Sequence, residues 1–348
     1  MSKRCNMKKI LLIGGTGTIS APVAHLLSEN PDIELYMLTR GKRSDALGSH
    51  VHRLIGDAND EEGLKKLLEG YSFDTVINFI LFQKAQAEMM VRLFAGKVSQ
   101  FIFISTNVAL NHDTSVNVNE SLPLGNEYSS YGAAKAECEA YFMQEYREHG
   151  FPVTIVRPTQ TYSDHRLPLS VKPGGYWPVI SRILRDKEVI VHGDGEGVWA
   201  GTHADDFARN FIGLVGNEKT VGEAYLIVNP EPYTWNNLYR ALGEAMGKEV
   251  HIVHIPTQML ALSKKYRFDQ SIRGDKYYSN IFDLSKLERV IGRAEFKISM
   301  KEGIRMYLAY MDEHPELKKE DPEFDAWCDH VIDTYRRCIE QFGNEDGI

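Results

Sequence analysis

One tyrosine in the chain is followed by a lysine at a spacing that suits acid–base chemistry on a hydroxyl group. Lys135 lies four residues after Tyr131, and this separation along a helix brings two side chains onto the same face. A nearby ammonium group favours the phenolate and lowers a phenol pKa from its usual value of about 10, which makes the tyrosine a general base. A chain of this composition contains about one such pair by chance, so the position of the pair decides its meaning.

Two hydroxyl groups precede this pair at the end of an expected strand. Residues 100–104 are mostly apolar, and Ser105 and Thr106 follow them. In open α/β sheets, ligands bind at the carboxyl ends of the parallel strands. We therefore expect Thr106 to hydrogen-bond the reacting hydroxyl or carbonyl group, with Ser105 as the fallback.

A glycine-rich turn follows the first expected strand, residues 9–13. The turn contains Gly14, Gly17, Thr18 and Ile19, and an apolar helix comes after it. Small residues let the backbone approach a pyrophosphate, whose charge is stabilised by the free N–H groups and the dipole of the helix. A surface turn is the alternative for an isolated match, but the strand and the helix on either side favour a dinucleotide site.

The end of the second expected strand has basic residues where NAD enzymes usually have a carboxylate. Arg40 stands there, and Lys42 and Arg43 follow it. Because a guanidinium group suits a ribose 2′-phosphate, the sequence favours NADP over NAD as the form of NAD(P) bound, with a solvated basic loop as the alternative. Asp57, after the third expected strand, either accepts a hydrogen bond from an adenine amino group or is a plain turn residue.

The elements that must position these residues alternate between strands and helices through the first half of the chain. We expect strands at 9–13, 34–38, 51–55, 75–79, 100–104 and 153–156, and helices at 21–28, 61–68, 84–94 and 129–149. Such alternation is typical of parallel strands joined by right-handed crossovers. The sequence thus predicts an α/β fold with a Rossmann-type doubly wound parallel sheet.

The alternation breaks after Pro158, where prolines and glycines cluster over residues 168–178. This break predicts a smaller, discontinuous C-terminal substrate lobe, with strands at 189–192 and 224–228 that return to the sheet or its edge. The expected domains are a dinucleotide-binding Rossmann domain over 1–165 with 187–215, a substrate-binding lobe over 166–186 with 216–312, and a C-terminal helical extension over 313–348.

Four motifs together make the chain resemble an extended short-chain dehydrogenase/reductase of the NAD-dependent epimerase/dehydratase family. They are the Gly14 loop, Ile104-Ser105-Thr106, Tyr131 with Lys135, and Arg157-Pro158. The resemblance runs from about residue 8 to about residue 310. It implies that Thr106, Tyr131 and Lys135 are the catalytic residues, and that Tyr131 takes a proton from a sugar hydroxyl while a hydride passes to nicotinamide. It also implies that Lys135 and Pro158 contact the cofactor.

Two departures from the family pattern change what we expect, one for the reaction and one for the packing of the glycine loop. Asn107 and Val108 stand where the 4,6-dehydratases of the family have an acidic pair, so elimination of water is not expected. Ser20 replaces the usual third glycine of the loop, which predicts looser packing of the helix against the pyrophosphate.

Three further positions bear on the substrate. Trp199 stands where the family's epimerases usually have an arginine that grips the substrate diphosphate. It either stacks on a base, a sugar or an aromatic aglycone, or it is an ordinary buried tryptophan. Arg273 matches the family's late nucleotide-contacting position, and Gln160 replaces a common asparagine. We expect these three residues to bind the substrate.

The resemblance implies an NAD(P)-dependent sugar epimerase or oxidoreductase that works through a keto intermediate, first of all on a nucleoside-diphosphate sugar. One alternative is a reductase or dehydrogenase of a carbonyl compound or sugar without a nucleotide. The other is a non-catalytic member that senses the cofactor or associates with RNA, as in the chloroplast stem-loop-binding branch. The net charge of −8 argues against nucleic acid as a partner, and the intact Thr106, Tyr131 and Lys135 argue against a silent site.

The composition excludes several other classes of protein. The 348 residues include only four cysteines, Cys5, Cys138, Cys328 and Cys338, without CxxC spacing, which predicts free thiols and a cytoplasmic location. No apolar run approaches the roughly 20 residues that span a bilayer, so no membrane segment is expected. His251 and His254 lack further ligands at metal spacing, so no metal site is expected either. The family resemblance implies a homodimer that pairs helices 84–94 and 129–149.

Overall fold

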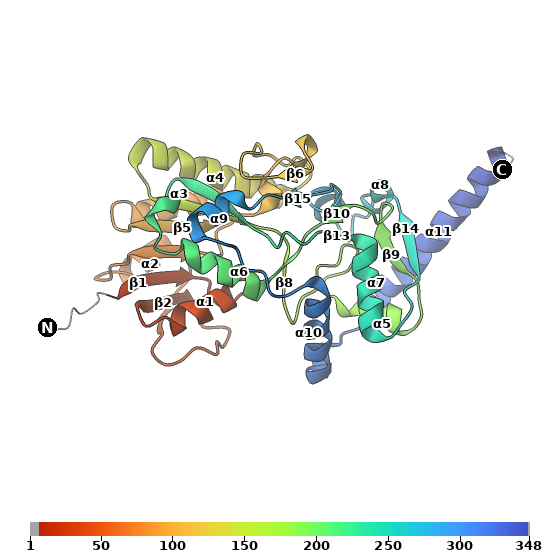
Figure 1. Ribbon diagram of the computed structural model, residues 1–348, viewed down its shortest axis with the longest axis horizontal. Coiled ribbons are helices and arrows are strands. Elements are labelled where there is room, and N and C mark those ends of the chain that lie inside the picture. The colour runs from red at the N-terminus through yellow and green to blue at the C-terminus, as the bar shows by residue number, and fades with distance from the viewer. Residues whose placement is uncertain (1–6, 347–348) are drawn as a thin grey trace. The chain divides into compact units, whose positions relative to one another are not determined.

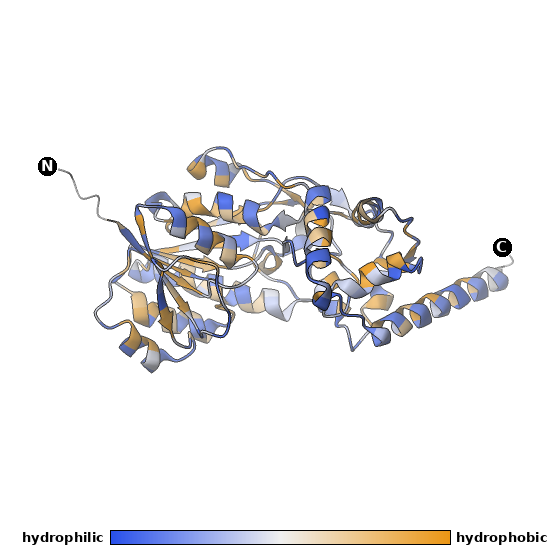
Figure 2. Ribbon diagram, turned by 90° about the horizontal axis from the view of Figure 1, so that it is seen from below, coloured by the Kyte–Doolittle hydropathy of each residue, from blue (hydrophilic) through white to orange (hydrophobic). Residues whose placement is uncertain are grey.

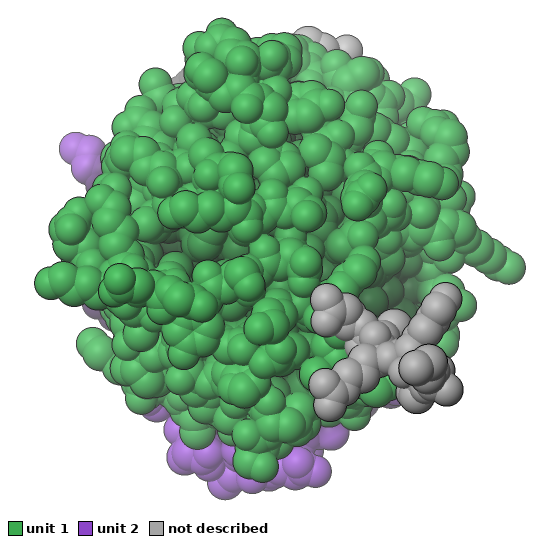
Figure 3. All heavy atoms as spheres, turned by 90° about the vertical axis from the view of Figure 1, so that its left-hand side faces the viewer, with its two compact units in different colours: residues 1–161, 202–230, 282–297 green, residues 162–201, 231–281, 298–348 purple. Residues whose placement is uncertain are grey.

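The computed structural model describes residues 7–346, which form two compact units (Figures 1 and 3). Unit 1 comprises Met1–Thr161, Thr202–Pro230 and Phe282–Lys297. Unit 2 comprises Tyr162–Gly201, Glu231–Ile281 and Ile298–Ile348. Cys5 lies outside the described residues.

Unit 1 is built on a sheet of seven strands in the order β12-β7-β5-β4-β1-β2-β3, and every pairing is parallel. The strands are β1 Lys8–Ile13, β2 Ile33–Thr39, β3 His52–Ile55, β4 Thr75–Asn78, β5 Gln100–Ile104, β7 Val153–Pro158 and β12 Glu223–Ile227. The strand order reverses between β1 and β4, which is where ligands bind in open α/β sheets. The expected Rossmann-type sheet is confirmed.

Helices cover both faces of this sheet, which explains why every residue of its central strands β4 and β5 is buried (Figure 2). Side chains of α2, α3 and α4 share one core with the sheet, and side chains of α1, α6 and α9 share another. The helices of unit 1 are α1 Ser20–Glu29, α2 Glu61–Leu67, α3 Lys84–Phe94, α4 Ser130–His149, α6 Ala204–Phe211 and α9 Ser285–Ile291. Its short elements are η1 Asn107–Ala109, η2 His112–Thr114, β6 Asn117–Val118, β11 Thr202–His203, η3 Ile212–Leu214 and η4 Glu218–Thr220.

Unit 2 has a core of its own, which contains the side chains of Trp199, Trp235 and Tyr239. Its elements are α5 Trp177–Leu184, β9 Val189–His192, β10 Val198–Trp199, β13 Tyr233–Thr234, α7 Trp235–Met246, β14 Ile252–Ile255, α8 Thr257–Leu260, η5 Asp269–Arg273, α10 Met300–Glu313, η6 Pro315–Leu317 and α11 Pro322–Asp346. The strands β9 and β14 pair in parallel, and β10 and β13 pair antiparallel. Two further strands, β8 Thr161–Tyr162 and β15 Ile281–Phe282, lie where the chain passes from one unit to the other.

The division into units differs from the expected domains at five segments. Residues 162–165 belong to unit 2, and residues 282–297 belong to unit 1. Residues 187–201 belong to unit 2 because β9 pairs with β14 and does not join the large sheet. Residues 216–230 belong to unit 1 because β12 extends that sheet beside β7. Residues 313–348 belong to unit 2 and do not form a separate extension, since α11 is bound to α5.

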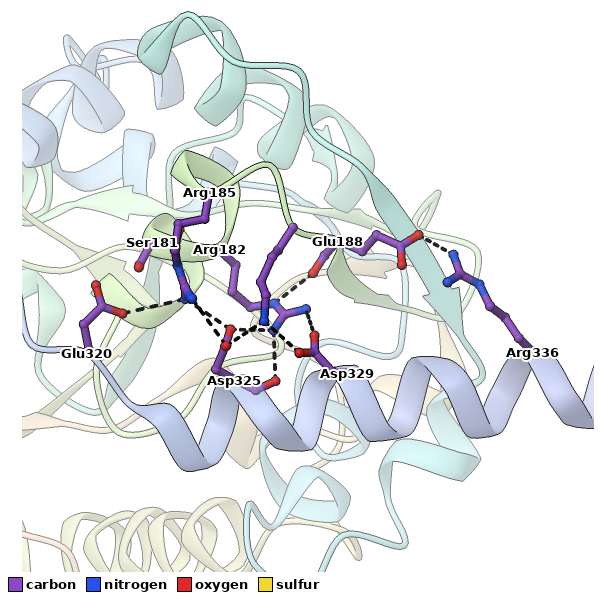
Figure 4. Close-up of polar contacts among 9 residues, drawn as sticks. Ser181, Arg182, Arg185, Glu188, Glu320, Asp325, Asp329 and Arg336 are labelled. Atoms are coloured by element: carbon purple, nitrogen blue, oxygen red, sulfur yellow. Dashed lines mark hydrogen bonds and ion pairs between the residues drawn. The ribbon is translucent and has the colours of Figure 1, made fainter.

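The link between α5 and α11 depends on the almost fully buried guanidinium group of Arg182 (Figure 4). Arg182 Nη1 donates to Asp325 Oδ1 at 2.6 Å, and Nη2 donates to Asp329 Oδ1 at 2.7 Å. Lys187 Nζ donates to the second oxygen of each carboxylate at 2.7 Å. Because a buried cation needs partners for all its donors, these bonds fix the first turns of α11 to the rest of unit 2.

Two properties of the described residues bear on cellular location. Among residues 7–346, no helix combines the length and the apolar character that crossing a membrane requires. Cys138 and Cys328 are buried free thiols, and Cys338 is an exposed one.

Replacing Arg182 tests the role of the α5–α11 link. We expect Arg182→Met to lower the free energy of unfolding by about 2 kcal/mol, because Asp325 and Asp329 lose a buried partner. Arg185→Met is the matched control, since that side chain contacts the same Asp325 but is 47% exposed, and it should cost less than about 1 kcal/mol. Urea unfolding measures both variants, and equal losses would contradict the assignment.

Candidate functional site

The loop after β1 needs glycine at its first position. Gly14 has a φ of +86°, and a Cβ atom placed there would lie 2.6 Å from Cγ2 of Ile80. Its N–H donates to the carbonyl oxygen of Leu38 at 3.1 Å, which ties the loop to the end of β2. The residue at this turn therefore has no side chain, and the turn lies at the place where the strand order of the sheet reverses.

Ser20, in the first turn of α1, joins the two ends of this loop. Its Oγ donates to the carbonyl oxygen of Gly14 at 2.6 Å and accepts from the N–H of Gly17 at 2.8 Å. Ser20, at the position of the usual third glycine, thus closes the loop with its side chain. Looser packing of the helix against a pyrophosphate stays a prediction. The sequence contained the serine, but only the loop geometry shows that its hydroxyl reaches Gly14.

A pocket of about 390 Å³ opens over this loop and brings together four of the predicted cofactor residues, Gly14, Gly17, Arg40 and Asp57. The other predicted cofactor residues, Thr18, Ile19, Lys135 and Pro158, are not part of its lining. Ile19 is the N-cap residue of α1, so the helix begins directly after the glycine loop.

The residues of the pocket fit a dinucleotide. The glycine loop leaves room for a close approach of phosphate to the backbone, and the N-terminus of α1 adds a positive partial charge. Three cationic side chains, Arg40, Lys42 and Arg43, also line the pocket and are exposed to solvent. Their charge suits the phosphate groups of the cofactor.

Asp57 lines the same pocket and also has a local role in its own turn. Its Oδ1 accepts from the N–H of Asn59 at 3.0 Å and from Asn59 Nδ2 at 3.1 Å. This is the plain turn aspartate that the sequence left open as an alternative. A contact with adenine stays a prediction.

Sequence reasoning missed the polar link between this turn and the start of α3. Gln86 Nε2 donates to Asn59 Oδ1 at 2.5 Å, and Gln86 Oε1 accepts from the N–H groups of Phe82 and Gln83. Gln83 and Gln86 form a capping box at the N-terminus of α3. The spacing of the two glutamines was the only available signal in the sequence, and it did not indicate contact with Asn59.

The pair Tyr131 and Lys135 lies on α4, as the spacing predicted. The helix begins after Ser129, whose Oγ accepts from the N–H of Gly132 at 3.1 Å. A Cβ atom on Gly132 would lie 2.3 Å from the carbonyl oxygen of Val108. The first turn of α4, and Tyr131 with it, is therefore packed closely against the segment after β5.

Lys135 is almost fully buried. Its ammonium group donates to the carbonyl oxygens of one residue after β4 and of the last residue of β5. Nζ donates to the carbonyl oxygen of Leu81 at 2.5 Å and to that of Ile104 at 2.7 Å. Burial lowers the pKa of Lys135 to about 8, which the charges of Cys138 and Glu139 partly oppose. The ammonium is thus retained at neutral pH but is much easier to deprotonate than that of an exposed lysine.

Phe82 connects the dinucleotide pocket with this pair. Its side chain lines the pocket, and its ring centroid lies 4.7 Å from Lys135 Nζ and 6.4 Å from the ring centroid of Tyr131. Nζ is also 5.9 Å from the Tyr131 ring centroid. The two halves of the predicted chemistry, cofactor residues and acid–base residues, are therefore neighbours in unit 1. No feature of the sequence indicated this role for Phe82.

Thr106 directly follows β5 and starts the short helix η1. It is buried, and its Oγ1 accepts from the N–H of Val108 at 3.2 Å. Because the backbone of Val108 lies against Gly132, the segment that begins with Thr106 packs on the first turn of α4, which contains Tyr131. Next to Thr106, the Asn107 amide is fully buried, and neither of its polar atoms has a partner among the described residues.

Ser105, the fallback for Thr106, already has a strong partner. Its Oγ donates to Glu139 Oε1 at 2.5 Å, and Glu139 forms a buried ion pair with Arg157 at 2.5 Å. This places Ser105 in a structural network between β5, α4 and β7. Pro158, the next residue after Arg157, is the buried last residue of β7.

The three predicted substrate residues have different surroundings. Gln160, in unit 1, has a buried Oε1 without a partner among the described residues. Trp199, in unit 2, has no exposed surface and packs on Trp235 with ring centroids 5.1 Å apart. This agrees with the ordinary buried tryptophan that the sequence left open. Arg273 ends the helical turn η5 of unit 2 and is half-buried.

In the part of the chain that the structure describes, no group of three or more histidine, cysteine, aspartate or glutamate side chains is arranged to hold a metal ion.

Comparisons with known proteins agree with this geometry. The sequence model of the NAD-dependent epimerase/dehydratase family matches residues 10–227. Among solved structures, UDP-glucuronic acid 4-epimerase from Bacillus cereus, in complex with UDP-glucuronic acid and NAD, has a TM-score of 0.69 and 20% sequence identity. The match covers 88% of this chain and 99% of that chain, and it shows a shared fold.

Two curated relatives differ in what they do. The 2′-dehydrokanamycin reductase of Streptomyces kanamyceticus is 22% identical over 286 residues, which is 81% of this chain and 78% of that protein. The chloroplast stem-loop binding protein of 41 kDa b of Arabidopsis thaliana is 26% identical over 308 residues, which is 84% of this chain and 76% of that protein. Similarity at this level leaves the reaction and the substrate of this chain open.

Replacing Lys135 tests whether its ammonium is buried as described. The pKa of Lys135 is about 8 in the folded chain and 10.5 when exposed, so the unfolded chain binds more protons between these two pH values. Wild-type stability should therefore rise, relative to Lys135→Met, by about 3 kcal/mol as the pH increases through this window.

Urea unfolding at several pH values between about 7.5 and 10.5 measures this difference. Lys84→Met, at an exposed lysine of α3, is the control and should leave the wild-type pH dependence unchanged. Parallel profiles for wild type and Lys135→Met would show that the ammonium is not buried in the native chain.

Proposed function

Because the chain belongs to the NAD-dependent epimerase/dehydratase family, whose members are enzymes of the short-chain dehydrogenase/reductase superfamily, we propose that it oxidises a hydroxyl-bearing carbon of a sugar, or reduces the corresponding carbonyl. The observation that supports this most is the contact of Phe82 with both the dinucleotide pocket and the Tyr131–Lys135 pair. A nicotinamide dinucleotide, when bound, supplies the group that accepts or returns a hydride.

Unit 1 would hold this cofactor through the residues of its pocket. The Gly14 loop and the N-terminus of α1 bind the pyrophosphate, and Arg40 binds a 2′-phosphate on the adenosine ribose. This assignment makes NADP the preferred form. Asp57 lines the same pocket and would accept a hydrogen bond from the adenine amino group.

The chain's own residues would then move the proton. Tyr131, as a phenolate, takes the proton of the substrate hydroxyl, and Thr106 donates a hydrogen bond that orients the reacting oxygen. The Lys135 ammonium favours the phenolate because it places a positive charge near the Tyr131 ring. Loss of a proton and a hydride leaves a keto sugar. Delivery of the hydride to the opposite face of the carbonyl carbon, with return of the proton from Tyr131 to the oxygen, would complete an epimerisation.

Two substrate classes remain in this proposal, and each has its own support. A nucleoside-diphosphate sugar is supported by relatives such as the dTDP-D-glucose 4,6-dehydratase of Homo sapiens, which is 24% identical over 248 residues. A sugar without a diphosphate is supported by the buried Trp199, which leaves no cation at the position where the epimerases have arginine. The reductase of 2′-dehydrokanamycin is a relative whose name indicates a substrate of this second kind.

We propose a compartment, an assembly and a class of partner for the chain. Two buried free thiols and one exposed thiol support a reducing compartment such as the cytoplasm. A homodimer through α3 and α4 is the assembly that the family resemblance implies. The acidic net charge of −8 supports small molecules over nucleic acid as partners.

Removing one hydroxyl tests the proton step. Tyr131→Phe should lower kcat at least about 100-fold, because a general base contributes a factor of this size or more. Tyr146→Phe, on the same helix, is the matched control and should keep wild-type turnover. The assay follows dinucleotide reduction with a panel of sugars and sugar nucleotides. Full turnover by Tyr131→Phe would remove the proposed role.

Cofactor preference can be tested by binding alone. Wild-type chain should bind NADPH more tightly than NADH in titration calorimetry. Arg40→Ala should weaken NADPH about tenfold and leave NADH nearly unchanged, because only NADPH has the phosphate that Arg40 contacts. Arg92→Ala, at an exposed arginine that does not line the pocket, should change neither affinity. Tighter binding of NADH by the wild type would reverse the proposed preference.

A further inference from the structure

One peptide group joins the dinucleotide pocket of unit 1 to the Lys135 ammonium. The carbonyl oxygen of this group, from Leu81, accepts from Lys135 Nζ at 2.5 Å. Its N–H, from Phe82, donates to Gln86 Oε1 at 2.7 Å. Gln86 Nε2 donates in turn to Asn59 Oδ1 at 2.5 Å. Because hydrogen bonds in a chain polarise one another, these three bonds couple the ammonium to Asn59.

The side chain of Gln86 holds this peptide group at the edge of the pocket. Its Oε1 also accepts from the N–H of Gln83 at 2.9 Å, so two successive N–H groups are bound to one oxygen. Gln86 and Asn59 both line the pocket, as does Phe82. A dinucleotide in the pocket would therefore lie against the residues that fix the backbone of Phe82.

Two phenylalanine rings lie against the Lys135 ammonium. Nζ is 4.7 Å from the ring centroid of Phe82 and 4.8 Å from that of Phe103. Phe103 is fully buried in β5, whereas Phe82 is 41% exposed. Lys135 itself is only 1% exposed. The ring of Phe82, next to that of Tyr131, therefore covers the ammonium on a side that faces solvent.

Exclusion of water changes how strongly the ammonium acts on the neighbouring phenol. The energy between two charges varies inversely with the effective dielectric constant, which is lower where water is absent. A cation behind an apolar ring therefore favours a phenolate more than a hydrated cation at the same distance does. The face of the ring also attracts the cation and so holds it in place. Phe82 thus affects the proton step without contact with the substrate.

We propose that Phe82 and Gln86 are positioning residues of the proton step. Gln86 holds the backbone of Phe82 in place, and the Phe82 ring keeps water away from the Lys135 ammonium. The ammonium then acts on Tyr131 with little screening. The inference rests on the proposed function and deepens it, because it says how the charge beside Tyr131 is kept effective.

Urea unfolding across pH tests whether Phe82 keeps water away from Lys135. In wild type, the free energy of unfolding should rise between about pH 7.5 and 10.5, because burial lowers the pKa of Lys135 to about 8. Phe82→Ala admits water to the ammonium and brings that pKa back toward 10.5, so the rise should be about half that of wild type. Gln86→Met should reduce the rise by a smaller fraction, because the ring is retained but its backbone is held less firmly.

Two further variants serve as controls. Phe82→Tyr retains the ring and should keep the wild-type rise. Phe342→Ala makes the same truncation at a phenylalanine of unit 2 that is 72% exposed, and it should also keep the rise. A loss of packing alone would lower the stability of Phe82→Ala by the same amount at every pH and leave its pH dependence unchanged.

The pH dependence of kcat/KM, measured in the dinucleotide assay, supplies a second readout. Its acid limb reports the ionisation of the general base, which is assigned to Tyr131. Phe82→Ala should move this limb upward by about one pH unit, because a hydrated ammonium favours the phenolate less. Phe82→Tyr should leave the limb where wild type has it. A structural role alone would lower kcat/KM without moving the limb.

Equal rises in wild type and Phe82→Ala would overturn the inference, as would an acid limb that stays in place. The urea measurement needs no substrate, so it can fail while Tyr131→Phe still abolishes turnover. Full turnover by Tyr131→Phe would instead remove the proton step and leave the urea result intact. The two failures are therefore distinguishable.

Discussion

The two hydrogen bonds of the Lys135 ammonium hold together the elements on which the site in unit 1 depends. Nζ joins the carbonyl oxygens of Leu81, after β4, and Ile104, at the end of β5, to the first turns of α4. This is the edge of the sheet where the strand order reverses and where ligands bind in this class of fold. The same bonds fix the position of α4 relative to the sheet, and with it the position of Tyr131. Burial of the charge costs stability, which the two carbonyl oxygens partly offset.

The sequence predicted the parts of this arrangement that local patterns specify. Apolar runs between turn residues predicted the strands of the parallel sheet, and the four-residue spacing placed Tyr131 and Lys135 on one helix. It could not predict contacts between residues far apart in the chain, such as Phe82 with Lys135 or Gln86 with Asn59. The segment 189–192 shows the same limit, because an apolar strand does not reveal which partner it pairs with.

The pockets of the two units differ in the charge of the side chains that line them. Arg40, Lys42 and Arg43 make the pocket of unit 1 suitable for phosphate, whereas Asp194 and aromatic rings line the pocket of unit 2. The buried Trp199 packs on Trp235, with ring centroids 5.1 Å apart. The chain has the fold of its family, and one fold serves several substrates through differences in the residues of its sites.

Mass spectrometry of the small molecules released from the purified, denatured chain tests the central claim most directly, which is that unit 1 binds a nicotinamide dinucleotide for hydride transfer. The chain is analysed as purified and again after incubation with NADP and NAD, followed by removal of unbound material. The account predicts that a nicotinamide dinucleotide is released, with NADP retained in preference to NAD after incubation. Release of no dinucleotide in either case would contradict it.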